Sequence, residues 1–191
     1  CESVVFNGDG YSAEWHAEAE RRGLPNMKTT ADALPVLRQS DVIELFKKYN
    51  VLSPREMESR YEVYAEQYEM SINVESNIML EMAKTIVYPV AITYQTELAD
   101  NIATLKAVGI DGNTCVLDKV SGLVNGLLDA IAALEAAKTK EHDGPEAGCN
   151  WCRDGIIPAM EALRAVVDAL EGEVADELWP LPTYQEMLFI R

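Results

Sequence analysis

The stretch SPREMESRYEVYAEQYEMSINVESNIMLEMAKTIVYPVAITYQTELADNIATLKAV, residues 53–108, decides the fold of this chain. Ser53 can cap a helix, Pro54 suits its first position, and Glu56 completes a capping box. Apolar residues then recur every three or four positions, a spacing that predicts one long helix: Met57, Tyr61, Tyr64, Tyr68, Ile72, Met79, Met82 and Ile86. Because no loop signal accompanies Pro89, we expect a kink there and a helix that resumes as far as the turn at residues 109–113.

Two more segments carry a helical apolar stripe. The first contains Leu117, Val120, Val124, Leu127, Ile131 and Leu134, and the second contains Ile156, Met160, Leu163, Val167, Leu170 and Val174. The sequence EHDGPEAG, residues 141–148, is expected to form the loop between them. Three long amphipathic segments joined by short turns predict an all-α fold, an antiparallel helical bundle.

Shorter helices are expected at both ends of the chain. Their start signals are Ser12, Thr30, Ser40 and the Thr183/Glu186 capping box. The first helix should end near Gly23, the second against Pro35 and the third near Asn50. We therefore predict an N-terminal junction over residues 1–52 and a helical bundle over residues 53–191, with no convincing strand.

Composition limits the classes of partner. The formal net charge of −16 is spread along the chain of 191 residues, so no basic face is available for nucleic acid or for anionic lipid. We find no long apolar run or leader, and expect no membrane span. Four cysteines are too few for a disulfide framework in a chain of this length, which favours a cytoplasmic protein. Because the sequence begins at Cys1, we expect a piece of a longer chain.

The turn FNGDGYSAEW, residues 6–15, is a candidate phosphate loop, but it does not match the known phosphate-binding motifs. Gly8-Asp9-Gly10 lacks the Lys of a P-loop and the third Gly of a dinucleotide fingerprint. Asp9 would also put negative charge where phosphate should bind. We interpret the segment as a turn, with glycines in unusual backbone angles, that leads into a capped helix.

Cys149 and Cys152 form an isolated Cys-x-x-Cys pair, to which His142 could add a third metal ligand. A zinc site lacks an obvious second pair, and thioredoxin-like chemistry lacks its βαβ setting. We favour the interpretation that both thiols take part in neither catalysis nor metal binding, with a small thiol or zinc protein as an alternative.

The long stripe raises two further candidates. Tyr61, Tyr64 and Tyr68 could line a ligand groove, although such spacing is more typical of a core. Glu75 falls between Ile72 and Met79 on the same stripe, where a carboxylate needs a partner. We favour a structural ion pair or an interface contact over a catalytic carboxylate, since no second carboxylate shares the stripe nearby.

Three separate blocks of sequence resemble the C-terminal region of type III glutamine synthetases. They are FNGDGYSAEWHAEAERRGLPNMKTTADALP at residues 6–35, ESRYEVYAEQYEMSINVES at residues 58–76, and IPAMEALRAVVDALEGEVADELWPLPTYQEMLF at residues 157–189. The resemblance implies a homo-oligomeric ligase that makes glutamine from glutamate, ammonia and ATP with Mg²⁺ or Mn²⁺. The family's catalytic, nucleotide and metal residues belong to motifs upstream of Cys1, so none is assigned to this chain.

The resemblance therefore implies a helical domain that packs against the catalytic domain or a neighbouring subunit and has no ligase activity alone. A different class remains open: a free-standing acidic helical module that binds a protein partner. The thiol or zinc protein built on Cys149 and Cys152 is the third alternative.

Overall fold

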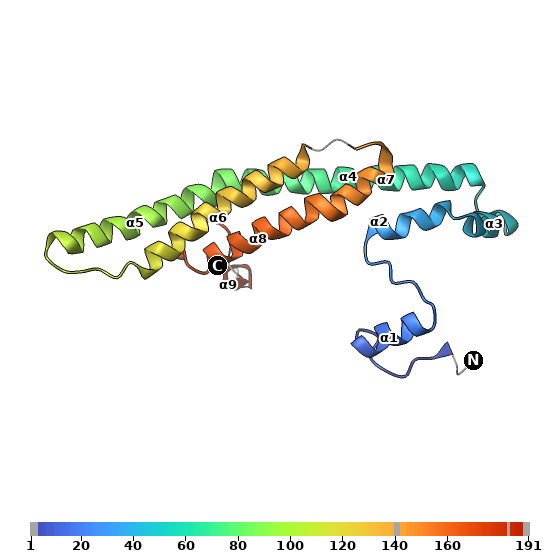
Figure 1. Cartoon of the computed structure of the whole chain (residues 1–191), viewed down its shortest axis with the longest axis horizontal. Helices are drawn as coiled ribbons and strands as arrows, with labels where there is room; N and C mark the ends of the chain where they lie inside the picture. The colour runs from blue at the N-terminus through green and yellow to red at the C-terminus, as the bar shows by residue number, and fades with distance from the viewer. Residues whose placement is uncertain (1–3, 140–141, 183, 189–191) are drawn as a thin grey trace. The chain divides into compact units, whose positions relative to one another are not determined.

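The computed structural model describes residues 4–139, 142–182 and 184–188. Every regular element in these ranges is helical, which confirms the predicted all-α class (Figure 1). The α-helices are α1 (Ala13–Arg21), α2 (Thr30–Ala33), α3 (Ser40–Lys48), α4 (Pro54–Met82), α5 (Tyr88–Ala107), α6 (Cys115–Lys138), α7 (Gly144–Trp151), α8 (Ile157–Glu171) and α9 (Tyr184–Leu188). A 3₁₀ turn, η2 (Leu34–Arg38), and two π-helical turns, η3 (Ala83–Val87) and η4 (Cys152–Ile156), connect some of them.

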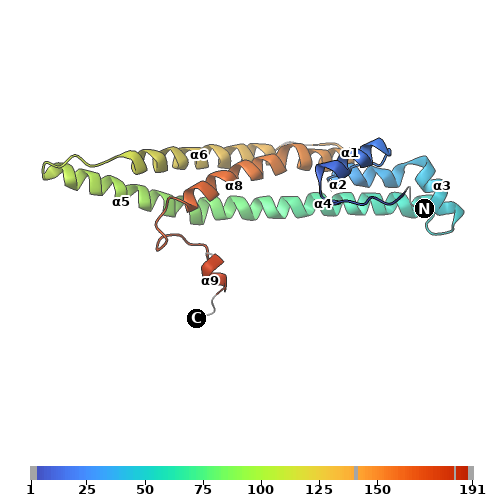
Figure 2. The same cartoon turned by 90° about the horizontal axis from the view of Figure 1, so that it is seen from below.

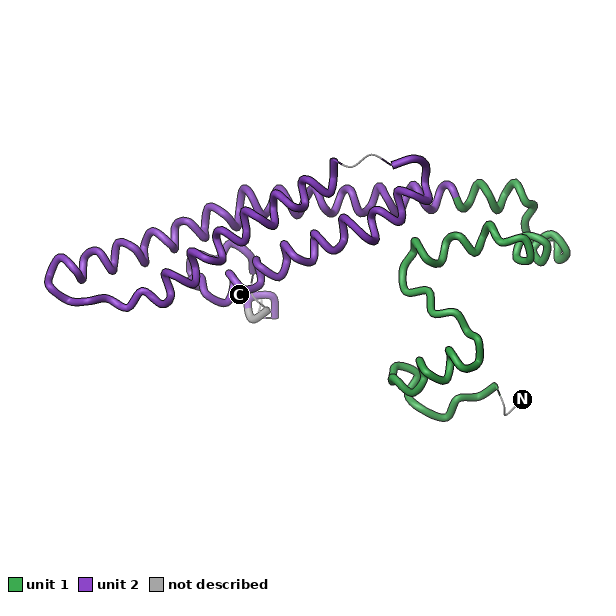
Figure 3. The backbone as a smooth tube through the Cα atoms, viewed as in Figure 1, with its two compact units in different colours: residues 1–61 green, residues 62–191 purple. Residues whose placement is uncertain are grey.

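The chain forms two compact units, drawn in different colours in Figure 3. Unit 1 comprises Cys1–Tyr61 and unit 2 comprises Glu62–Arg191. The division falls inside α4 rather than at the 52/53 boundary suggested by the sequence.

The long helix runs through Pro89 as the sequence predicted. Pro89 has no N–H, and its ring would press on the carbonyl of Thr85 in a regular α-helix. The π-helical turn η3 lies immediately before α5 and places Pro89 within the first turn of that helix. A wider turn relieves this conflict without ending the helix, so α4, η3 and α5 follow one another without a loop.

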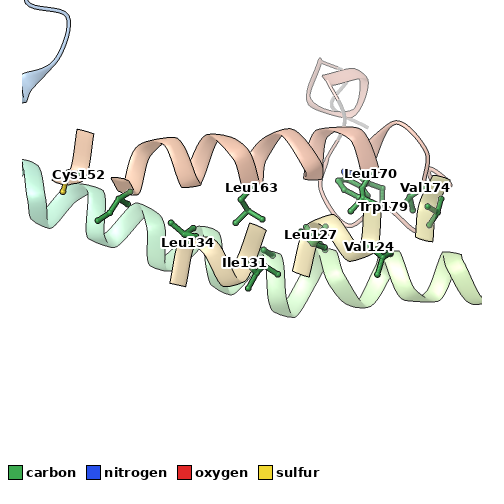
Figure 4. Packing of buried hydrophobic residues seen from close by; sticks show 14 residues of the cluster. Val124, Leu127, Ile131, Leu134, Cys152, Leu163, Leu170, Val174 and Trp179 are labelled. Atoms are coloured by element: carbon green, nitrogen blue, oxygen red, sulfur yellow. The ribbon is translucent and has the colours of Figure 1, made fainter. Parts of the chain in front are cut away.

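The apolar core of unit 2 lies where α6 packs against α8. Figures 1 and 2 show α6 returning along α5, with α8 beside α6. The predicted stripes meet in this core, where the buried members are Val120, Val124, Leu127, Ile131, Leu134, Ile156, Leu163, Leu170 and Val174. Figure 4 shows side chains of the two helices pointing toward one another, with Trp179 beside Leu170. At roughly 1.5–3 kcal/mol for each fully buried large side chain, this seam is the main source of stability in unit 2.

Most of the helix starts in unit 1 follow the sequence signals. Ser53 and Glu56 form the predicted capping box: the Ser53 N–H donates to Glu56 Oε2 at 2.7 Å and the Glu56 N–H donates to Ser53 Oγ at 3.3 Å. Ser12 caps α1 by accepting from the Trp15 N–H at 3.3 Å. Gly23, with φ of 73°, follows the end of α1 at a backbone angle that favours glycine.

Two details of unit 1 correct the prediction. Thr29, not Thr30, caps α2, because its hydroxyl accepts from the Asp32 N–H at 3.2 Å. The chain does not stop at Pro35 either. Pro35 sits in the first turn of the 3₁₀ turn η2, a position where its missing N–H leaves no hydrogen bond unmade.

The expected loop at residues 141–148 is also corrected. α7 begins at Gly144, with Asp143 before it and Pro145 in its first turn, so helix covers residues 144–148, more than half of the predicted loop. Pro145 thus acts as a helix-start residue rather than a loop residue. Cys149 and Cys152 consequently lie inside a continuous helical segment that runs through η4 into α8. The capping role predicted for Thr183 falls outside the described residues.

Among the described residues, α6 is long and apolar enough to cross a membrane, with a mean hydropathy of 1.4 over its most apolar window. The sequence predicted no membrane-spanning helix. Length and composition alone do not separate a spanning helix from a core helix. In this structure 28% of that window is buried, and the buried residues of α6 lie in the core of unit 2.

Candidate functional site

The turn before α1 is held by Asp9 and is not shaped for phosphate. Asp9 Oδ1 accepts from the Tyr11 N–H at 2.9 Å, and its carbonyl accepts from the Ser12 hydroxyl at 2.7 Å. A backbone N–H that a phosphate would need is therefore already bonded to a carboxylate. Neither Gly8 nor Gly10 has positive φ, which corrects the expectation of unusual angles. A Cβ at Gly8 would lie 2.8 Å from the Phe6 ring, so this glycine makes room for an aromatic side chain.

A small cluster of aromatic and charged side chains surrounds α1. The Phe6 and Trp15 ring centroids are 4.9 Å apart, and the Arg22 guanidinium lies 5.9 Å from the Trp15 ring. Glu18 accepts from Arg21 at 2.7 Å and from Arg22 at 2.5 Å. Hydrogen bonds from Arg21 and then Arg22 lower the pKa of Glu18 to about 2. Apart from the exposed Arg21 the cluster is half-buried, and its charged groups pair with one another, so it is best explained as local structure.

A polar contact joins α4 to the end of α6 within unit 2. Lys138 Nζ donates to Ser76 Oγ at 2.7 Å and to Asn73 Oδ1 at 3.1 Å, and Ser76 Oγ donates to Asn73 O at 3.0 Å. Ser76 is fully buried. Burial lowers the pKa of Lys138, while the nearby Cys152 thiol acts in the opposite direction. Neutral oxygens thus satisfy an ammonium group without a carboxylate at this contact.

The structure corrects the position assigned to Glu75. Its side chain is exposed, and the neighbouring Ser76 occupies the buried position of the stripe. Both residues fit helical spacing after Ile72, because steps of three and of four remain on one face. Because the Glu75 side chain is exposed, its position does not require a structural ion pair.

The tyrosine stripe is partly a packing surface. Tyr61 is buried in unit 1, where the Arg38 guanidinium lies 4.9 Å from its ring. Tyr68 packs on the core of unit 2, whereas Tyr64 is 43% exposed. The three rings therefore do not share one environment, and a common ligand groove gains no support from their burial.

Cys149 and Cys152 are buried free thiols. Burial, followed by the charge of Glu69, raises the pKa of Cys149, and the same causes raise that of Cys152 to about 11. The Cys149 thiol faces Ala65 O at 3.6 Å. Both thiols therefore stay protonated at neutral pH, whereas a cysteine nucleophile needs the thiolate.

His142, the third ligand considered, is engaged elsewhere. Its Nε2 lies 3.0 Å from Glu69 Oε1, so the chain just before α7 lies against α4. Gly148 allows this approach, since a Cβ there would lie 2.4 Å from Glu69 Oε2. Among the described residues, no group of three or more His, Cys, Asp or Glu is arranged to hold a metal ion. His142, Cys149 and Cys152 therefore do not form a three-ligand metal group in the described structure.

The outer face of α4 carries an apolar row that the sequence analysis did not single out. Its members are Val63, Met70, Val74 and Ile78, which are 54%, 66%, 52% and 51% exposed. Intervals of seven, four and four place them on one side of the helix, opposite the side that packs on the core. This spacing is visible in the sequence, but spacing alone does not show which side chains of a helix stay exposed.

Comparison with known proteins identifies the family. Residues 1–106 match the family model described as the glutamine synthetase C-terminal domain. The chain belongs to this family. The match covers α1 to α5 almost completely and includes two of the three blocks on which the resemblance rested.

Relatives of this glutamine synthetase C-terminal domain extend the similarity over the rest of the chain. A type-3 glutamine synthetase of Dictyostelium discoideum is 35% identical over 98% of the chain. Glutamine synthetases of Butyrivibrio fibrisolvens and Bacteroides fragilis are 32% and 30% identical over 97% and 100% of it. The chain spans 27% of the length of each of these relatives. The resemblance to type III enzymes is thus confirmed at the level of the domain.

Proposed function

We propose that this chain is the helical accessory domain of a homo-oligomeric glutamine synthetase and acts through packing rather than chemistry. The full enzyme would join ammonia to glutamate with ATP and Mg²⁺ or Mn²⁺, in a reducing cytoplasm. The observation that carries the proposal is the family match over residues 1–106, together with relatives that are glutamine synthetases about four times as long.

The described side chains support a role without catalysis. The described contacts hold helices together: buried thiols with raised pKa values, a polar contact between His142 and Glu69, and a lysine bonded to neutral oxygens. No nucleophile with an adjacent base is found among the parts of unit 2 that the structure describes. The partners proposed are the catalytic part of the same polypeptide and neighbouring subunits.

A ligase assay tests whether catalysis resides outside this chain. The chain of 191 residues, supplied with ATP, Mg²⁺, glutamate and ammonia, should form no glutamine, and the same polypeptide with its catalytic part should form it steadily. Turnover by the shorter chain would overturn the proposal.

Genomic context distinguishes the free-standing interaction module. An open reading frame that continues upstream of Cys1 into a catalytic domain supports the accessory role, and a start codon immediately before Cys1 supports the module. Either result is obtained without purifying the protein.

A further inference from the structure

The outer row of α4, formed by Val63, Met70, Val74 and Ile78, needs an explanation because it is unusual within its own bundle. Large hydrophobic side chains with more than a third of their surface exposed are absent from α5 and α8, both fully described helices of unit 2. α6 has only two, Val116 and Leu128, each 42% exposed. Met70, Val74 and Ile78 follow one another at steps of four residues, so their exposed side chains are neighbours on one face, and exposed apolar patches mark interaction sites.

The charges around the outer row have one sign. Between Tyr61 and Met82 the sequence contains five glutamates and no lysine or arginine. Four of them are exposed: Glu62, Glu66, Glu75 and Glu81. The fifth, Glu69, faces His142. The row is therefore an apolar strip with an acidic border, and the matching surface is apolar at its centre and basic at its edge.

A second copy of this chain does not offer such a surface. Two α4 faces would bring glutamates against glutamates, and a chain with a formal charge of −16 repels its own copies. The relatives provide a different candidate, since about three-quarters of each lies outside the region matched by this chain. That remainder is much larger than this domain.

We propose that the outer row of α4 is the docking surface by which this domain binds the remainder of its glutamine synthetase polypeptide. The complementary surface there has an apolar centre bordered by Lys or Arg side chains. This inference rests on the proposed accessory function and adds the face and the chemistry of the contact.

Hydroxyl-radical labelling of Met70 in the full-length polypeptide tests the inference. Met70 is 66% exposed in the domain, and its thioether oxidises readily when solvent reaches it. We expect Met70 to be labelled about tenfold or more slowly in the full-length protein than in the chain of 191 residues, as expected for burial in a packed interface. Equal labelling in both would overturn the inference.

Paired substitutions identify the face. Val74→Lys with Ile78→Lys should restore rapid Met70 labelling in the full-length protein. The matched control, Val116→Lys with Leu128→Lys, replaces exposed apolar residues of α6 and should leave Met70 protected. All four positions are exposed, so circular dichroism should report unchanged helix content in both variants. Continued protection in the Val74/Ile78 variant, or lost protection in the control, contradicts the assignment.

The remaining outcomes separate this inference from the proposed function. If Met70 is freely labelled while removal of the domain still disrupts the enzyme, docking uses another face and only this inference fails. If removal changes neither assembly nor activity, the accessory function itself fails. A Val74→Cys variant that forms disulfide-linked pairs of full-length chains would show that a second copy occupies the face, which also overturns the inference.

Discussion

The two units of the chain are held together in different ways. Unit 2 contains a continuous buried cluster from α5, α6, α8 and the π-helical turns. In unit 1, the described buried hydrophobic residues are only Ala31, Met57 and Tyr61. Many of its other contacts lie at the surface, such as Glu18 with Arg21 and Arg38 Nε with Glu58 at 3.3 Å. The difference indicates that unit 2 has a self-sufficient core, whereas unit 1 relies on surface contacts that are individually weak.

The largest effect should come from the core of unit 2. Leu163 is fully buried against α6, so Leu163→Ala is expected to lower the free energy of unfolding by about 2–5 kcal/mol. Urea denaturation followed by circular dichroism measures this loss. Leu45, which lies in unit 1 and is 52% exposed, provides the matched control, and Leu45→Ala should change stability by about 0.5 kcal/mol or less. Similar losses for both would remove the contrast between the units.

A smaller loss is expected at Gly155 in the π-helical turn η4. A Cβ there would lie 2.6 Å from the Trp151 ring, whose Nε1–H donates to Ala137 O at 2.9 Å. The ring cannot move without losing that hydrogen bond, so Gly155→Ala should lower the free energy of unfolding by about 1–3 kcal/mol. Gly122 has no neighbour within 4 Å of its Cβ position, and Gly122→Ala should be neutral or stabilising. A stable Gly155→Ala protein would show that the ring contact is unimportant.

The contact of Lys138 predicts a pH dependence. Burial lowers its pKa from 10.5 in the folded protein, so the folded chain releases this proton before the unfolded chain does. Between the lowered pKa and 10.5 the unfolded state binds more protons, and this contribution to stability should rise with pH. The buried thiols act in the opposite direction, because their raised pKa values favour unfolding at high pH.

Comparison with Lys138→Met separates the two contributions. We expect the variant to lose stability more steeply than the wild type as pH rises above 9, measured by urea denaturation at a series of pH values. Parallel curves for the two proteins would contradict the assignment of a lowered Lys138 pKa.

The smallest effect belongs to unit 1. The pKa of Glu18, about 2, is lowered from 4.5 by hydrogen bonds from Arg21 and Arg22. A lowered carboxyl pKa contributes stability that is present above 4.5 and lost as pH falls from 4.5 through about 2. Because its partner Arg21 has 72% of its side chain in solvent, the effect on global stability should be small. Carbon-13 NMR of the carboxyl carbon should show a midpoint well below 4.5, which Arg21→Gln moves upward; an ordinary midpoint in the wild type would refute the pairing.

Much of the fold follows from local signals in the sequence. Three features are each encoded within a few turns of helix: the Ser53/Glu56 capping box, the apolar stripes of α6 and α8, and the continuation of the long helix through Pro89. Such signals predict an element without reference to its neighbours. They were therefore reliable in the long amphipathic segments.

The contacts between elements could not be predicted in the same way. Glu75 and Ser76 fit the stripe equally by spacing, and only the position of Lys138 on α6 shows which of them is buried. Pro145 is compatible with a loop and with the first turn of a helix. The structure has the helix, in which Gly148 and Cys149 are buried against α4. The candidate zinc pair likewise depended on His142, which the structure places against Glu69.

The central claim is that this domain supports the assembly of a glutamine synthetase without contributing chemistry. Native mass spectrometry of the full-length polypeptide, with and without residues 1–191 of this chain, tests it most directly. The account predicts a homo-oligomer for the intact protein and smaller species with reduced glutamine formation after deletion. An oligomer of unchanged subunit number and full activity after deletion would contradict it.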